Sequence, residues 1–179
     1  MRRLALVLLL LLPAAVACGI QPTGVVDLGK APVVSVKPTF RTVYLLRKGR
    51  LEPQRVSTAS GTVDDVIEAL FKAGDQHLGG MNSALKGFRH ADTQVTNYGR
   101  VLRNDPDRPI GLRLHVFLSG DGRVSRAALA QLTCTAMLSK EIWVVQVTQI
   151  SSHGTPSSRG DHVCSEFRDL AGSDTQLPP

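Results

Sequence analysis

The chain has 179 residues, a formal net charge of +6 and three cysteines. This length suits one domain with a substantial core, and the basic residues are scattered rather than gathered into the runs that mark nucleic-acid or heparin surfaces. Composition therefore favours a single domain and argues against a nucleic-acid partner.

The first 17 residues have the pattern of an export signal. Two arginines precede an apolar run over residues 4–16, and small residues stand directly before Cys18. The run is shorter than the roughly 20 residues that span a bilayer, and Pro13 interrupts it. Residues 15–18, Ala-Val-Ala-Cys, resemble a bacterial lipobox, in which the cysteine is acylated and the chain is cut just before it. We expect a lipoprotein signal peptide over residues 1–17; a plain secreted protein and an uncleaved anchor are the alternatives.

Cys18 determines the expected location. The lipobox resemblance implies acyl chains such as palmitate on this residue, and two chains suffice for stable anchoring. We expect the mature protein to be tethered to the extracytoplasmic face of the cell membrane, with its charge lowered by the two arginines that leave with the signal. Residues 18–40 contain three prolines among glycines and small residues, which predicts an extended spacer.

The domain is expected over residues 41–170 and opens with a hairpin. Residues 42–46 are β-branched and aromatic, residues 51–56 alternate, and Gly49 stands in the turn between them. Pro53 predicts an edge strand, because proline has no amide hydrogen to donate.

A helix is predicted from Thr62 to Gly74. The threonine can cap, two aspartates complement the positive end, and the glycine offers a stop. Apolar residues recur at the spacing of one helix face: Val63, Val66, Ile67, Leu70 and Phe71. Glycines and a loop break the following stretch, residues 75–107, in which only residues 93–102 suggest a strand.

The next three elements have clearer patterns. Residues 111–118 alternate and predict a strand, after which Ser125 caps a second helix that runs to about Ser139 and is rich in Ala and Leu. Residues 142–147 predict a central strand, because their apolar character is nearly continuous. Trp143 is expected in the core.

The C-terminal part is more polar. Residues 151–160 predict a loop, and residues 171–179 a disordered tail. Helices that alternate with strand pairs predict a single α+β domain, with two helices packed on a mixed or mostly antiparallel sheet.

Cys134 and Cys164 remain once Cys18 is assigned to lipid. An even pair in an oxidising compartment predicts a disulfide; two unpaired buried thiols are the alternative. Neither Cys-x-x-Cys nor Cys/His metal spacings occur in the sequence, so zinc is not suggested.

No pattern of catalytic residues emerges. The Gly-x-Ser-x-Gly motif of many serine hydrolases is absent, and the five histidines never have the His-x-x-x-His spacing. His115 lies in an apolar strand and is expected to be half-buried. His153, Asp161 and His162 share one region and form the best metal candidate, a weak one. We expect no enzymatic activity, no cofactor and no metal.

Two stretches resemble a known family. Residues 43–53, Val-Tyr-Leu-Leu-Arg-Lys-Gly-Arg-Leu-Glu-Pro, are similar to the opening hairpin of GerMN-like domains, the module named from spore germination and sporulation proteins. Residues 127–136 are similar to the family's second helix. The Cys-Thr variant there, with a second cysteine near the C-terminus, resembles lipoproteins of high-GC Gram-positive bacteria. The family's usual Leu-Leu-x-Gly-Pro is absent, because residues 70–75 contain no proline.

The GerMN resemblance implies a non-catalytic interaction or ring-building module, in envelope signalling or sporulation-related assembly. We therefore expect a membrane-anchored protein-interaction domain. Its candidate contact surface is the hairpin edge, where Arg47, Lys48 and Arg50 can meet an acidic partner in the cell envelope. The alternative is a small-ligand or cell-wall-binding lipoprotein, which needs a concave apolar pocket. An envelope hydrolase is a third, less favoured class.

Overall fold

A computed structural model describes residues 39–76, 79–99 and 111–179. The predicted signal peptide, the lipidation site Cys18 and almost all of the spacer lie outside the described residues. The elements are strands β1 (Thr39–Arg47) and β2 (Arg50–Thr58), helix α2 (Val63–Asp75), strands β3 (Arg89–Tyr98) and β4 (Gly111–Ser119), helix α3 (Arg126–Ala136), strands β5 (Ile142–Ile150) and β6 (Pro156–His162), and the 3-10 helix η2 (Cys164–Leu170). No helix in this part of the chain is long and apolar enough to cross a bilayer.

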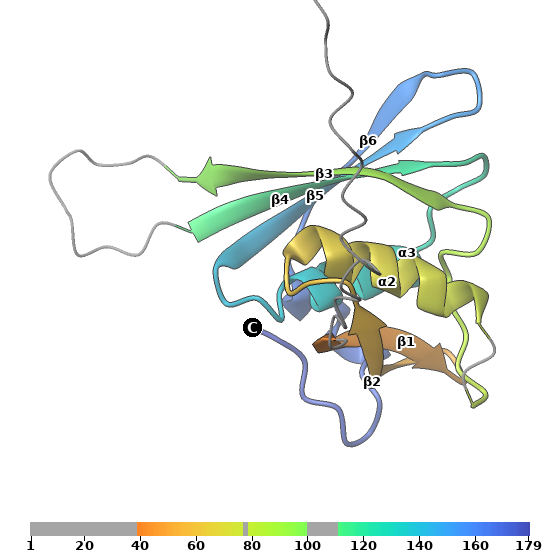
Figure 1. The fold of residues 1–179 in the computed structure, drawn as a ribbon, viewed down its shortest axis with the longest axis vertical. Helices are drawn as coiled ribbons and strands as arrows, with labels where there is room; N and C mark the ends of the chain where they lie inside the picture. The colour runs from red at the N-terminus through yellow and green to blue at the C-terminus, as the bar shows by residue number, and fades with distance from the viewer. Residues whose placement is uncertain (1–38, 77–78, 100–110) are drawn as a thin grey trace, which may run out of the picture. The chain divides into compact units, whose positions relative to one another are not determined.

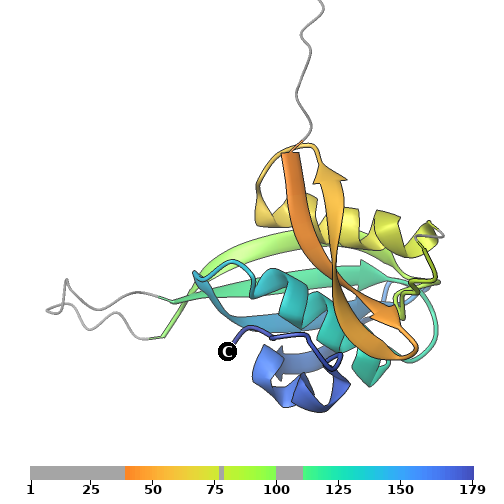
Figure 2. The same ribbon diagram turned by 90° about the horizontal axis from the view of Figure 1, so that it is seen from below.

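The predicted α+β class is confirmed, with helices packed on a mixed sheet. The larger sheet has the order β3-β4-β5-β6, and only β4 and β5 are parallel, joined through α3. The β1-β2 hairpin forms a separate two-stranded sheet. Both helices lie between the hairpin and the larger sheet (Figures 1 and 2). The domain therefore has three layers: the hairpin, the two helices and the larger sheet.

The hairpin is confirmed, with a turn of two residues. Lys48 and Gly49 have φ values of 49° and 79°, and two successive positive values are characteristic of the tight hairpin turn in which glycine is favoured. Pro53 lies on β2, which pairs with β1 alone among the described strands, so its predicted edge position is also confirmed.

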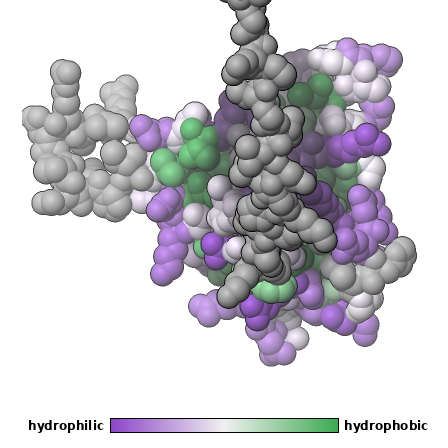
Figure 3. Space-filling model, in the orientation of Figure 1, coloured by the Kyte–Doolittle hydropathy of each residue, from purple (hydrophilic) through white to green (hydrophobic). Residues whose placement is uncertain are grey.

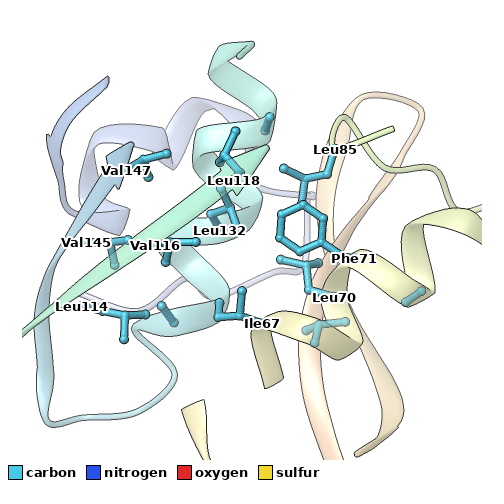
Figure 4. Packing of buried hydrophobic residues seen from close by; sticks show 14 of the residues in the cluster. Ile67, Leu70, Phe71, Leu85, Leu114, Val116, Leu118, Leu132, Val145 and Val147 are labelled. Atoms are coloured by element: carbon cyan, nitrogen blue, oxygen red, sulfur yellow. The ribbon is translucent and has the colours of Figure 1, made fainter. Parts of the chain in front are cut away.

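The main core lies between the helices and the larger sheet (Figure 4). It is formed by apolar side chains of α2, β4, α3 and β5, among them Ile67, Leu70, Leu114, Val116, Leu118, Leu132, Val145 and Val147, all of which are fully buried. Burial of each such side chain contributes about 1.5–3 kcal/mol. This core fixes both helices against the sheet.

The predicted helix caps are confirmed. The Thr62 hydroxyl accepts a hydrogen bond from the Asp65 amide at 3.3 Å, and the Ser125 hydroxyl accepts one from the Ala128 amide at 3.2 Å. Gly74, predicted as the stop of the first helix, lies one residue inside it. A Cβ at this position would overlap Ser83, so the glycine serves close packing instead.

A second, smaller core contains the disulfide. Cys134 on α3 and Cys164 at the start of η2 are bonded and fully buried, which confirms the predicted pair. Residues 171–179, predicted as a disordered tail, contact both strands of the hairpin in the structure. The Gly172 amide donates to the Leu51 carbonyl at 3.0 Å, and the Tyr44 hydroxyl donates to the Gln176 carbonyl at 3.2 Å.

Two sequence predictions on the larger sheet are wrong. β6 occupies the second half of the predicted polar loop, because an edge strand with exposed side chains needs no apolar alternation. Trp143 is 44% exposed rather than in the core. The β4–β5 register shifts from Ile142 to Val144, which leaves Trp143 in a bulge with its ring against Gly111, where a Cβ would overlap it.

Polar and apolar side chains are unevenly distributed over the surface of the domain. In the space-filling view, hydrophobic side chains gather beside the end of β3 and the start of β4, and the opposite margin is largely hydrophilic (Figure 3). Three large exposed hydrophobic residues belong to the larger sheet: Val95, Tyr98 and Trp143.

Candidate functional site

A cavity of about 600 Å³ opens where the start of β1, the start of α2 and the end of α3 meet. We call it the β1 cavity. Its lining residues are Phe40, Arg41, Thr42, Arg55, Gly61, Val63, Val66, Thr135, Ala136, Leu138 and Ser139. Its volume lies within the range of small-molecule sites, about 300–1,000 Å³.

The walls of the β1 cavity are partly apolar. Phe40 and Leu138 are 54% and 40% exposed, and they are two of the large hydrophobic side chains that the described structure leaves in contact with solvent. Val63 and Val66 face it from α2, on the margin of the main core. Covering such surface is favourable by about 25 cal/mol per Å², so an apolar group of a ligand would gain free energy here.

The charged side chains of the cavity are both cationic. The Arg55 guanidinium lies 5.5 Å from the centroid of the Phe40 ring. The Arg41 guanidinium lies against Gly61, where a Cβ would overlap it. No described carboxylate forms an ion pair with either arginine, and no acidic residue lines the cavity. The arrangement therefore favours a negatively charged group.

Asp65 adjoins the lining residue Val66 in sequence, and the turn before α2 holds its carboxylate. Its carboxylate accepts hydrogen bonds from the hydroxyls of Ser60 and Thr62. These bonds, the one from Ser60 first, lower the pKa of Asp65 below its usual 3.8. The carboxylate thus stays ionised and fixes the loop that carries Gly61.

The backbone groups on the outer edge of β1 have different hydrogen-bond partners along the strand. Next to the turn, Leu46 exchanges backbone hydrogen bonds with Asn82 at 2.7 and 2.8 Å. Further along, the Tyr44 amide donates to the Thr135 hydroxyl at 2.9 Å, and the Gln131 side-chain amide donates to the Tyr44 carbonyl at 3.1 Å. Side chains of α3 therefore substitute for a neighbouring strand at this point.

Beyond Tyr44, the edge opens into the β1 cavity. Residues alternate in an antiparallel strand, so Thr42 and Phe40 direct their backbone groups to the same side as Tyr44. No described residue pairs with the backbone of Thr42 or Phe40 on that side. We call these two residues the open edge.

The predicted contact residues lie at the other end of the hairpin. Arg47 pairs with Glu52 at 2.7 Å, and Arg50 donates to the carbonyl of Asp169. Lys48 is exposed in the turn. Two of the three predicted cations therefore have internal partners, and the part of the β1 edge without a described partner lies at the opposite end of the hairpin.

The predicted metal candidates are not brought together. Asp161 pairs with Arg113 at 2.9 Å, and Nδ1 of His162 lies 3.1 Å from Glu166. Across the described ranges, no group of three or more His, Cys, Asp or Glu side chains is placed to hold a metal ion. His115 is partly buried, as predicted, and its Nε2 lies 2.8 Å from the Thr148 hydroxyl.

Sequence reasoning missed the β1 cavity. The sequence pattern places Phe40 in the spacer, Arg41 at the start of the domain and Thr42 at the start of the first strand. One signal was available, because Thr39-Phe40-Arg41 extends the β-rich run of residues 42–46 without a break. The opposite walls come from residues about 100 positions later, and no local pattern connects them.

Comparison with known proteins does not assign the chain to a family. No family model matches the sequence, and no curated protein matches it. Among solved structures, the chain is similar to the tandem GerMN domains of the sporulation protein GerM from Bacillus subtilis, with 15% identity and a TM-score of 0.43. The similarity covers 74% of this chain and 49% of that one, so the chain spans about half the length of the matched structure.

Proposed function

We propose that this protein is an exported lipoprotein whose domain is a non-catalytic, GerMN-like binding module. Its lipid anchor is Cys18, and its binding site is the β1 cavity. The pattern of residues 1–18 supports the anchor, and the hairpin and second-helix sequences support the family. The Cys134–Cys164 disulfide is compatible with an oxidising compartment outside the cytosol.

The observation that carries the binding role is the composition of the β1 cavity. Apolar walls and two cations without a described carboxylate partner form one concave site. Such a site suits a ligand with an apolar part and a negatively charged group. The partner would be met in the cell envelope, in processes such as envelope signalling or sporulation-related assembly.

An anionic, apolar fluorescent probe tests this site directly. We expect anilinonaphthalene sulfonate to bind the folded full chain with one-to-one stoichiometry and a rise in fluorescence. The double variant Arg41→Gln/Arg55→Gln should weaken binding by about tenfold or more, since charge-assisted bonds contribute about 1.5–3 kcal/mol. Ala136→Phe should also weaken binding of the probe. Ala136 is buried in the wall of the cavity, and the larger phenylalanine side chain would take up space there.

Arg168→Gln is the matched control, because Arg168 is an exposed arginine outside the cavity lining. It should leave the affinity for the probe unchanged. Equal binding by the double variant, or weak binding at many sites, would contradict the proposed site.

A further inference from the structure

We infer that the β1 cavity binds an extended peptide segment of a partner protein, which adds as a strand to the open edge and places an acidic side chain beside Arg41 and an apolar side chain beside Phe40. This inference rests on the proposed function, because it names the occupant of the same cavity.

The backbone of the open edge favours a peptide over a compact small molecule. Thr42 and Phe40 present amide and carbonyl groups at the two-residue repeat of a β-strand, and a peptide backbone matches this repeat. At Tyr44 the same groups are already satisfied by Gln131 and Thr135 of α3. α3 ends at Ala136, so its side chains no longer cover the next outward residue, Thr42. Peptide binding between a strand edge and a helix is a recurring recognition mode.

The side chains around the open edge indicate which types of peptide side chain would be favoured. Arg41 lacks a carboxylate partner among the described residues and points to the opposite face of β1 from Phe40, so a Glu or Asp side chain on its face would complete charge-assisted hydrogen bonds. Phe40 and Leu138 expose apolar surface at the same site. A strand that alternates acidic and apolar residues satisfies both features, because its successive side chains point to opposite faces.

The outer edge of β2 is less suited to strand addition. Near the turn, its Leu51 carbonyl already accepts the Gly172 amide at 3.0 Å. Two residues later, Pro53 has no amide hydrogen to offer. Both features obstruct an added strand, and this leaves the open edge of β1 as the favoured docking site on the hairpin.

The test starts from a display library of random linear peptides, selected on the purified full chain, in detergent if it is acylated. We expect the enriched peptides to alternate acidic and apolar residues and to compete with anilinonaphthalene sulfonate. Thr42→Pro removes one outward amide hydrogen and leaves the ladder to β2 intact, so the best peptide should bind about tenfold more weakly. Ser57→Pro is the matched control: it changes an outward position of β2 and should keep the affinity within about twofold.

Backbone N-methylation of the peptide gives a second test that leaves the protein unchanged. Methylation at the amides that face β1 should weaken binding by about tenfold or more, and methylation at the intervening amides should have a much smaller effect. If Thr42→Pro lowers the thermal midpoint of the domain, weaker binding by that variant could come from partial unfolding. The comparison between the N-methylated peptides then decides whether the peptide adds as a strand.

The outcomes separate this inference from the proposed function. Affinity that is insensitive to both Thr42→Pro and N-methylation overturns strand addition. Failure to select any peptide, with the fluorescent probe still bound at the cavity, overturns the peptide and leaves the binding site. If neither binds, both proposals fail. Self-association that Thr42→Pro abolishes would identify a second copy of the chain as the occupant and overturn the peptide partner.

Discussion

Gln131 joins three parts of the domain through buried hydrogen bonds. Its side-chain amide donates to the Tyr44 carbonyl at 3.1 Å, and its Oε1 accepts from the Ala84 amide at 2.7 Å. The side chain is fully buried on α3, between β1 and the segment before β3. A buried polar side chain of this kind is favourable only while every partner is satisfied.

Gln131→Met is expected to destabilise the domain by about 2–6 kcal/mol. Methionine keeps the length and volume of the side chain but leaves the Tyr44 carbonyl and the Ala84 amide without partners, at about 1–3 kcal/mol each. The free energy of unfolding in urea measures this loss. Gln94→Met, at an exposed position on β3, is the control and should change it by less than about 0.5 kcal/mol. Equal effects of the two variants would contradict the role of Gln131.

His115 makes stability depend on pH. Burial, and then the nearby positive charge of Arg113, lower the pKa of this imidazole below its usual 6.5. Asp161 and Asp92 oppose the shift without reversing it. Between the two pKa values the unfolded chain binds more protons than the folded one, so folding stability falls as the pH drops below about 6.5.

His115→Gln should therefore flatten the pH dependence of stability. We expect the difference in unfolding free energy between pH 7.5 and pH 5.5 to be smaller in the variant than in the natural protein, because glutamine does not titrate and can still bond Thr148. Urea unfolding at both pH values measures it. The same or a steeper dependence in the variant would show that other groups are responsible.

At the scale of elements, the disulfide holds η2 on α3. Cys134 and Cys164 are 30 residues apart, and a cross-link of that span stabilises a fold by roughly 3–4 kcal/mol in chain-entropy models. The double variant Cys134→Ala/Cys164→Ala should lose about this much unfolding free energy. Alkylation of the folded protein without reductant should label neither cysteine, and rapid labelling of both would exclude the bond in solution.

Local signals made some elements predictable. The hydroxyl groups of Thr62 and Ser125 each accept a hydrogen bond from an amide three residues later, so both caps are local. Gly49 supplies the positive φ that the short turn needs. β6 gave no such signal, because its pairing with β5 is a property of the whole sheet. The exposure of Trp143 likewise depends on a shift in strand register that the sequence does not encode locally.

The same reasoning explains why the hairpin could be anticipated and the binding site could not. The hairpin and its exposed cations follow from residues 42–56. The β1 cavity instead depends on where α3 ends relative to β1, as the contact between Tyr44 and Thr135 shows. Ninety-one positions separate these two residues, so only tertiary packing brings them together.

At the scale of the whole molecule, only a short stretch of sequence separates the open edge from the proposed lipid anchor at Cys18. Residues 19–38 separate Cys18 from β1, and a chain of this length spans at most about 70 Å. If Cys18 carries lipid, the β1 cavity is confined to a thin layer next to the bilayer. Partners at the membrane surface would then be encountered at a high effective concentration.

Anchoring and binding should therefore be separable. We expect Cys18→Ala to move the protein from the membrane fraction to the soluble fraction, because the residue would no longer carry the acyl chains that hold it. The affinity of the β1 cavity for anilinonaphthalene sulfonate should not change. Mass spectrometry of the N-terminal peptide from the natural protein provides the direct measurement: a diacylated or triacylated Cys18 is expected. An unmodified cysteine, or a chain cut elsewhere, would remove the anchor from the proposed function, while the cavity would remain to be tested independently.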